Sequence, residues 1–233
     1  FRPCWNVTRD SLHSHPRLRI LATSLEKDDH MNNNNGAPLS SVTGFLKAKF
    51  EFPESELIKF SACVQRHTIT RGERFLDAGK IPGRLAYVNT GLFRYLYTDS
   101  NGSEYTKGFF PKGDFVVSYS AMVSQTPSWF SIEALEDSVI DVFDYTNWQQ
   151  LFHGHTCWAS LLIAMLQKGY MKKEKREREL LMLDASERYQ SFLKDYPGLE
   201  ARVRQHMIAS YLGITPVALS RIRSQSKKTT PLT

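Results

Sequence analysis

The sequence predicts an α+β fold in which a β-rich domain is followed by a long helix and a short, basic, helical C-terminal unit. Between residues 67 and 143, short β-branched and aromatic runs are separated by glycines, a pattern typical of antiparallel strands. Between residues 148 and 183 there is no proline, and apolar residues recur at helical spacing. Residues 201–233 contain six Lys and Arg residues and no Asp or Glu, so this end of the chain is strongly cationic.

The composition argues against several classes of protein. With 233 residues, 41% of them hydrophobic, the chain can bury one large core or two modest ones. Cys4, Cys63 and Cys157 lie far apart without metal-ligand spacing, which predicts no metal site and no cofactor and fits a reducing cytoplasm. Without an apolar run of about 18 residues or a signal-peptide pattern, neither a membrane span nor secretion is expected. No Ser/His/Asp order or phosphate-cradling glycine loop indicates an enzyme.

Residues 1–35 are expected to be a leader outside the folded domains. The chain begins at Phe1, and a candidate initiator, Met31, precedes the polar run Asn32–Asn35. We therefore interpret this segment as non-native or poorly ordered, and we assign no functional residue to it.

The β-rich domain is predicted to span residues 36–147. A short helix from Glu54 to Cys63 precedes the strands and is expected to pack on them. The clearest turn is Asp99–Gly102, because Asn-Gly favours the positive φ angles of a hairpin. Regular punctuation by glycine indicates an antiparallel sandwich or barrel. The expected strands cover residues 85–89, 92–98, 105–110, 115–119 and 139–143.

Residues 148–183 are predicted to form one long helix that mediates dimerisation. Its first half carries an apolar stripe, whereas residues 172–179 are almost wholly charged. A small β-domain cannot cover the whole stripe, so a second copy of the helix across a two-fold axis is the simplest partner. Packing within its own protomer is the alternative. The dimer interface is expected to contain Trp158, Leu161, Leu162, Met165, Leu166 and Gly169.

Residues 184–233 are predicted to form a helix-turn-helix domain. Asp184–Ser186 supplies cap residues and a candidate hinge, and Pro197-Gly198 ends the helix that follows. A short amphipathic helix then ends at Gly213, where glycine tolerates a left-handed backbone. Thr215 caps a second helix whose first residue is Pro216, where the missing N–H is harmless. The buried side is expected to contain Met207, Ile208, Ala209, Tyr211, Leu212, Ile214, Leu219, Ile222 and either Val217 or Ala218.

The opposite face of that second helix is polar and basic, which indicates binding to double-stranded DNA. A helix of this size fits the major groove, where its N-terminal residues meet base edges and arginine can pair with guanine. Ser220 and Arg221 are the strongest candidates for these contacts. A helical hairpin that binds protein is the alternative. The candidate DNA-binding residues are Arg204, Gln205, Thr215, Pro216, Val217, Ser220, Arg221, Arg223 and Ser224, with Lys227 and Lys228 as further phosphate contacts.

The order of these elements resembles the Crp/Fnr family of bacterial transcription regulators over about residues 45–225. Ala86–Gly91 is similar to a strand-to-turn motif of the family, and Pro111–Phe115 is similar to the entry of its phosphate-binding cassette. Ile208–Arg221 is similar to its helix-turn-helix. The resemblance implies that the β-domain is a cyclic-nucleotide-binding-like jelly roll, also called a double-stranded β-helix, and that the long helix forms the dimer interface.

The chain also departs from the family pattern. In nucleotide-binding members, an Arg followed by Ser or Thr holds the cyclic phosphate. These positions fall on Ser128 and Trp129, so cyclic AMP is not the expected effector. The four cysteines of oxygen-sensing members are missing, and Pro216-Val217 stands where an Arg-Glu pair often begins the recognition helix. An unidentified small molecule is therefore expected in a pocket that contains Gly113, Asp114, Ser128, Trp129 and Glu133.

These expectations describe a cytoplasmic, homodimeric, sequence-specific DNA-binding transcription regulator. A signal in the β-domain would change the placement of two recognition helices through the long helix and the hinge near Asp184. RNA polymerase is a further partner that such a regulator would contact. The alternative function is a signalling protein that binds a cyclic nucleotide or another small ligand and acts through protein contacts. Added salt should weaken DNA binding steeply but leave apolar protein contacts intact.

Overall fold

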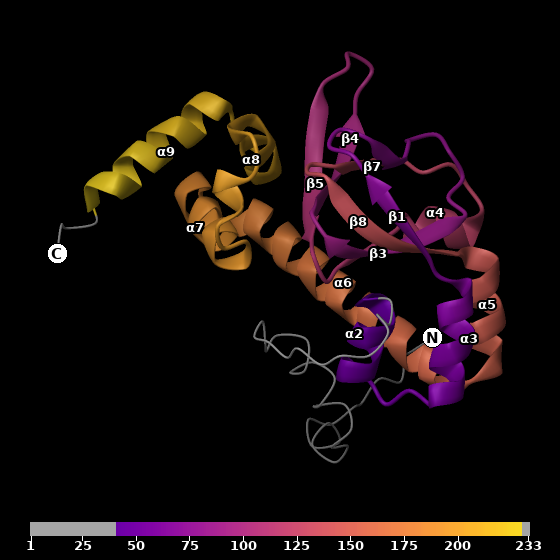
Figure 1. The fold of residues 1–233 in the computed structure, drawn as a ribbon. Helices are drawn as coiled ribbons and strands as arrows, with labels where there is room; N and C mark the ends of the chain where they lie inside the picture. Colours follow the sequence, from indigo (N-terminus) through magenta and orange to yellow (C-terminus); the bar gives the residue numbers. More distant parts are fainter. Residues whose placement is uncertain (1–40, 230–233) are drawn as a thin grey trace, which may run out of the picture.

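The computed structural model describes residues 41–229, so the expected leader at residues 1–35 lies outside the described part. Figure 1 shows a β-domain with one long helix beside it, which leads to a helical unit at the C-terminal end. The strands are β1 (Gln65–Ile69), β2 (Arg74–Leu76), β3 (Arg84–Thr90), β4 (Leu92–Thr98), β5 (Glu104–Pro111), β6 (Phe115–Val116), β7 (Ser131–Ala134) and β8 (Ser138–Asp144).

The β-domain is a sandwich of two four-stranded antiparallel sheets, with strand orders β1-β8-β3-β6 and β2-β7-β4-β5. Successive side chains on a strand point to opposite faces, so alternate residues of both sheets meet between them. Val88 and Ile140 from the first sheet and Phe93, Tyr95 and Ile132 from the second are buried in one cluster. The predicted antiparallel sandwich is thus confirmed.

The hairpin predicted at Asp99–Gly102 connects β4 and β5. The Asp99 carboxylate accepts hydrogen bonds from the backbone N–H groups of Asn101 and Ser103, both at 2.9 Å. Gly102 has φ +79°, which favours glycine. The strand predicted at 115–119 is shorter, because β6 ends at Val116 and a helix, α4 (Tyr119–Ser124), follows and buries Met122.

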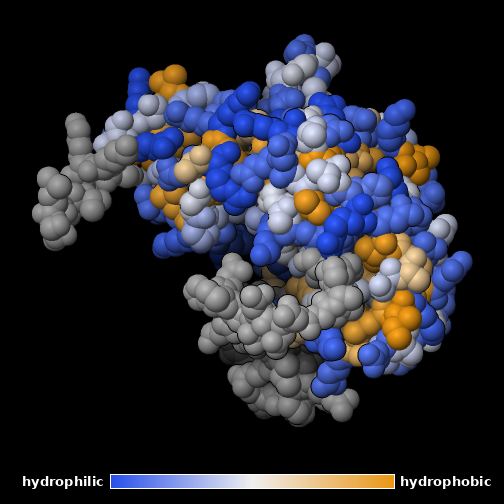
Figure 2. Space-filling view, in the orientation of Figure 1, coloured by the Kyte–Doolittle hydropathy of each residue, from blue (hydrophilic) through white to orange (hydrophobic). Residues whose placement is uncertain are grey.

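Two N-terminal helices, α2 (Ser41–Lys49) and α3 (Glu54–Cys63), pack against the β-domain. Asp141 of β8 is fully buried, and its carboxylate accepts hydrogen bonds from Val42 N at 3.1 Å and Arg66 Nε at 2.9 Å. The helix predicted from residue 54 to 63 is confirmed, with Phe60 buried. On the face shown in Figure 2, the most extended hydrophobic area lies at the lower right, where Figure 1 shows α3 and α5.

The long helix predicted over 148–183 is two helices, α5 (Tyr145–Gly154) and α6 (Thr156–Met182). His155 separates them with an extended backbone, φ −152° and ψ 144°, and its Nδ1 accepts a hydrogen bond from Cys157 N at 3.1 Å. The break lets Trp148 of α5 fold back against Trp158 of α6, with ring centroids 5.8 Å apart. Burial of both indoles favours the broken arrangement over a continuous helix.

The C-terminal unit contains α7 (Ala185–Asp195), a 3-10 helix (Leu199–Ala201), α8 (Gln205–Leu212) and α9 (Pro216–Thr229). Asp184 and Glu187 form a reciprocal capping box, which fixes the start of α7 immediately after the end of α6. The core of this unit also includes Leu92 and Phe109, which lie on the outer face of the β2-β7-β4-β5 sheet. The C-terminal unit therefore packs directly on the β-domain.

Candidate nucleic-acid interface and effector domain

A sharp turn joins α8 to α9. Gly213 has φ +68°, and a Cβ at this position would lie 3.4 Å from Leu180 Cδ2 of α6. The Thr215 hydroxyl accepts a hydrogen bond from Ala218 N at 3.2 Å, as expected for the residue that caps α9. Leu219 and Ala209 are fully buried between the two helices. The glycine, the cap and the apolar contact all lie where the sequence predicts them.

The outer face of α9 is open to solvent. Thr215, Pro216, Ser220 and Arg221 are exposed, as is Arg204 immediately before α8. Val217 is 62% exposed, so it belongs to this outer face, and the alternative residue Ala218 occupies the inner side. Lys227 and Lys228 lie in the last turns of α9, and their side chains are outside the described part of the chain.

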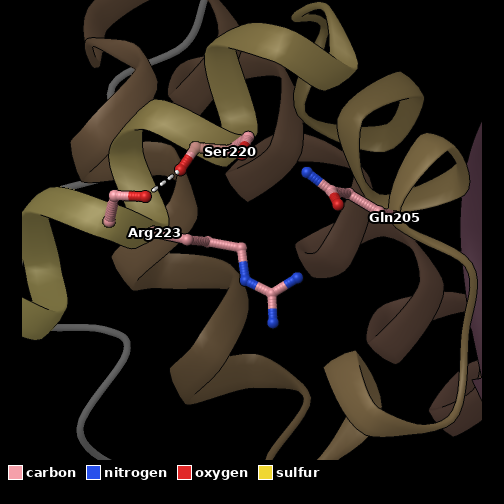
Figure 3. A pocket seen from close by; sticks show the side chains of 4 residues that line it. Gln205, Ser220 and Arg223 are labelled. Atoms are coloured by element: carbon pink, nitrogen blue, oxygen red, sulfur yellow. Dashed lines mark hydrogen bonds between the residues drawn. The ribbon is translucent and has the colours of Figure 1, made fainter.

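A shallow pocket lies between the start of α8 and the middle of α9, and it is lined by Gln205, Ser220, Arg223 and Ser224 (Figure 3). Gln205 Nε2 donates to Pro216 O at 3.2 Å, and Ser224 Oγ donates to Ser220 O at 3.0 Å. The first bond joins the start of α8 to the start of α9, whereas the second lies within α9.

Arg223 is placed differently from the other predicted DNA contacts. Its guanidinium pairs with Glu200 at 2.8 Å, and Glu200 also accepts a hydrogen bond from Tyr189 Oη of α7 at 3.1 Å. This ion pair anchors α9 to α7 and the 3-10 helix, and Arg223 stays a predicted DNA contact. Sequence inspection does not identify Glu200, since its partner lies 23 residues away.

Helix α8 docks on strand β5 through Ser210. Ser210 Oγ accepts a hydrogen bond from Thr106 N at 2.9 Å and donates one to Glu104 O at 3.3 Å. A second connection is the bidentate ion pair of Arg202 with Glu136, at 2.9 and 2.8 Å. Both bridge the β-domain and the C-terminal unit, and neither is evident from the sequence.

Aromatic rings and two cations of α6 fill the junction between these contacts. The ring of Phe109 of β5 packs against Phe192, Tyr196 and Tyr211, with centroids 5.5 to 6.2 Å apart. Lys172 Nζ donates to Phe109 O at 3.1 Å. Arg176 lies over the Tyr211 ring at 4.1 Å, and burial lowers the pKa of its guanidinium. Strand β5 therefore contacts residues of α6, α7 and α8 through this one junction, and a movement of β5 would change its contacts with all three helices.

The predicted dimer face of α6 separates into two groups. Trp158 and Leu161 are buried in the protomer's own core, which corrects their assignment to a dimer interface. The alternative of packing within the protomer holds for these two residues. The remaining face is open: Leu166 is 44% exposed, Leu162 and Met165 are half-buried, and Gly169 is exposed with open space around it. Two residues absent from the prediction, Ile163 and Tyr170, extend this face.

The residues predicted for an effector pocket do not converge. Gly113 lies in the β5–β6 turn with φ +90°, and Asp114 pairs with Lys168 of α6 at 2.7 Å. Ser128 is buried, and its hydroxyl bonds to Ser118 Oγ at 2.9 Å. Trp129 is 85% exposed. The predicted five-residue pocket is therefore corrected.

Glu133 lies on the outer face of its sheet. It pairs at 2.7 Å with Arg94, which is buried and also pairs with Glu104. Inside the sandwich, Tyr95 stacks between Phe110 and Phe130, with centroid distances of 3.9 and 4.8 Å. Burial raises the pKa of the Tyr95 hydroxyl, which bonds to the backbone of Val117. Aromatic rings thus line the interior of the β-domain.

Residues 41–229 contain neither a candidate metal-binding group nor a candidate membrane-spanning helix. Within this range, no group of three or more His, Cys, Asp or Glu residues is arranged to hold a metal ion. No helix in the same range is long and apolar enough to cross a membrane.

Comparison with known proteins identifies the β-domain. Residues 66–155 match the family described as the cyclic nucleotide-binding domain, and the match runs from the second residue of β1 to the residue that follows α5. No curated protein sequence matches the chain.

Solved structures of bacterial regulators share the wider fold. FixK2 from Bradyrhizobium japonicum has a TM-score of 0.64 at 20% identity, over 71% of this chain and 85% of its own. The c-di-GMP responsive global regulator CLP from Xanthomonas campestris has a TM-score of 0.62 at 18% identity, over 76% and 92%. A putative Crp/Fnr transcriptional regulator from Eubacterium rectale has a TM-score of 0.62 at 15% identity, over 78% and 88%. The chain thus has a cyclic nucleotide-binding domain within a Crp/Fnr-like fold.

Proposed function

We propose that this chain, which has the fold of Crp/Fnr regulators, is a homodimeric, sequence-specific DNA-binding transcription regulator. The observation that carries the proposal is the outer face of α9. Ser220 and Arg221 are exposed on a helix whose opposite side is anchored by Leu219, and a capped turn sets its angle to α8. This is the arrangement of a helix-turn-helix, in which the second helix enters the major groove.

The chemistry of this face suits DNA. An arginine on the exposed face can pair with the O6 and N7 atoms of guanine, and serine can contact bases or phosphates. Arg204, exposed before α8, is suited to a phosphate contact. Residues 201–233 contain no carboxylate that would repel the phosphate backbone.

A dimer would place two such helices on one DNA duplex. The exposed apolar face of α6, formed by Leu162, Ile163, Leu166, Gly169 and Tyr170, is suited to contact the same face of a second copy. Open space around Gly169 allows close approach of the two helices. A two-fold dimer presents its recognition helices to half-sites about 34 Å apart, one turn of DNA.

The effector domain has a direct route to α8. Strand β5 presents Phe110 to the interior of the sandwich and Phe109 to the C-terminal unit. A ligand that shifts β5 would alter the Ser210 contacts and the aromatic junction, in addition to the route through α6 and Asp184. The cassette positions hold Ser128 and Trp129, which lack the cation that a cyclic phosphate requires, so we propose an effector other than cyclic AMP.

The test begins by selecting binding sites from a pool of random DNA duplexes with the full chain. Arg221→Ala should then weaken binding to the selected site by about 1–3 kcal/mol, measured by fluorescence anisotropy. Lys80→Ala, an exposed change in the β2–β3 turn, is the control and should bind as the wild type does. Equal affinity of the Arg221 variant and the control would contradict the assignment of α9.

A further inference from the structure

Lys107 occupies an unusual place in strand β5. Tyr95 pairs with Gly108 and Leu96 pairs with Thr106, so Lys107 is the extra residue of a β-bulge. Bulges of this kind turn a side chain away from its regular direction. Here the ammonium of Lys107 lies against the aromatic lining of the effector domain.

The ammonium lies among three rings. Lys107 Nζ is 3.9 Å from the ring centre of Phe130, 5.7 Å from that of Tyr97 and 5.9 Å from that of Tyr95. Within the described chain, no Asp or Glu carboxylate lies within ion-pairing distance of Lys107. Partial desolvation by its surroundings, together with repulsion from Lys173 of α6, lowers the pKa of the Lys107 ammonium.

The surroundings remain accessible. Lys107 is exposed at the residue level, Tyr97 is 39% exposed and Tyr105 is 53% exposed. Lys173, also exposed, adds a second positive charge from α6. This place therefore combines flat apolar surface with positive charge that the described residues do not neutralise.

We propose that Lys107 is the anchor for a small organic anion with a flat aromatic body, which would bind at the inner side of the β4–β5 hairpin. The anionic group would pair with Lys107 and gain from Lys173, and the flat body would lie against Tyr97 and Tyr105. This inference rests on the proposed function, because it names the effector class of the same domain. It differs from cyclic nucleotide recognition in that the cation comes from β5.

The position of Lys107 also explains how such a ligand would be sensed. Its neighbour Thr106 donates its N–H to Ser210 of α8, and Phe109 packs on the aromatic junction of the C-terminal unit. An anion that shifts the Lys107 side chain would move the bulge in β5, and β5 is the strand to which α8 is hydrogen-bonded through Ser210. Binding and DNA affinity would therefore be coupled in both directions.

The experiment uses 2-naphthoate as a charged probe and 2-naphthamide as its neutral counterpart, each titrated into the full chain by calorimetry without DNA. We expect saturable binding of 2-naphthoate, no binding of the amide, and at least about a 10-fold loss of affinity in Lys107→Gln. Lys107→Arg should retain most of the affinity, and Lys80→Gln should match the wild type. Failure of wild-type protein to bind 2-naphthoate, or equal binding by Lys107→Gln, overturns the inference.

Anisotropy with the selected DNA separates this failure from failure of the proposed function. If wild-type protein binds DNA but not 2-naphthoate, the anion-site proposal is wrong and the DNA-binding proposal is retained. If it binds naphthoate through Lys107 but no DNA, the site stands and the DNA-binding proposal falls.

Discussion

Replacing Ser210 by alanine should loosen the C-terminal unit from the β-domain. The substitution removes two hydrogen bonds, from Thr106 N at 2.9 Å and to Glu104 O at 3.3 Å. Glu104 is exposed, so its carbonyl can bond to water, but Thr106 is buried and its N–H would be left without that partner. An unsatisfied buried donor costs about 1–3 kcal/mol, which corresponds to a roughly 5- to 150-fold change in an opening equilibrium.

Amide hydrogen exchange measured by mass spectrometry is the assay. In Ser210→Ala, peptides covering residues 104–109 and α8 should exchange faster by that factor, while peptides of β3 and β8 should keep the wild-type rate. Ser224→Ala is the matched control, because that serine bonds only within α9 at Ser220 O. Unchanged exchange in β5 and α8 would refute the argument that Ser210 holds the two parts together.

Three further predictions concern stability and assembly. Asp141→Ala should lower the free energy of unfolding by about 1–3 kcal/mol, because the buried Val42 N–H loses its acceptor. Thermal denaturation measures the loss of stability, and an unchanged midpoint temperature would contradict the prediction. Leu166→Asp should convert dimer to monomer in sedimentation, whereas the control Ile81→Asp, at a residue that is 55% exposed against 44% for Leu166, should not. A dimeric Leu166 variant would exclude this face. Hydrogen bonding to Arg202 lowers the pKa of Glu136 below its usual 4.5, so the stabilising ion pair is complete above that value and is lost as pH falls through the folded pKa. The rate of amide hydrogen exchange around the Arg202–Glu136 pair, corrected for intrinsic rates, should therefore rise in the wild type as the pH is lowered. Glu136→Gln should remove this pH dependence. The same response to acid in both proteins would contradict the prediction.

Local chemistry could be predicted from the sequence. Gly213, Thr215 and Leu219 take the backbone angle, the cap and the buried position that the sequence predicts, because each depends on neighbours within one or two helical turns. The Asp99–Gly102 hairpin follows for the same reason. Hydrophobic periodicity also located the sandwich strands with long buried runs, whereas β1, which is almost wholly exposed, lacks that signal.

Features that depend on distant partners could not be predicted. Periodicity shows that Trp158 and Leu161 share an apolar helix face, but it does not tell which surface covers that face, and the protomer's own core does. The break at His155 needs no proline, because it is stabilised by the packing of Trp148 on Trp158. The Ser210 contact joins residues more than 100 positions apart, and a serine on an amphipathic helix carries no mark of it.

The measurement that most directly tests the DNA-binding proposal is hydroxyl-radical footprinting of the selected DNA site with the wild-type chain. Two symmetric protected segments centred about 10 base pairs apart are expected, since a two-fold dimer would place one α9 helix in each of two successive major grooves. Methylation of guanine N7 within those segments should also block binding. A single protected segment, or binding that guanine methylation leaves unaffected, would contradict the account.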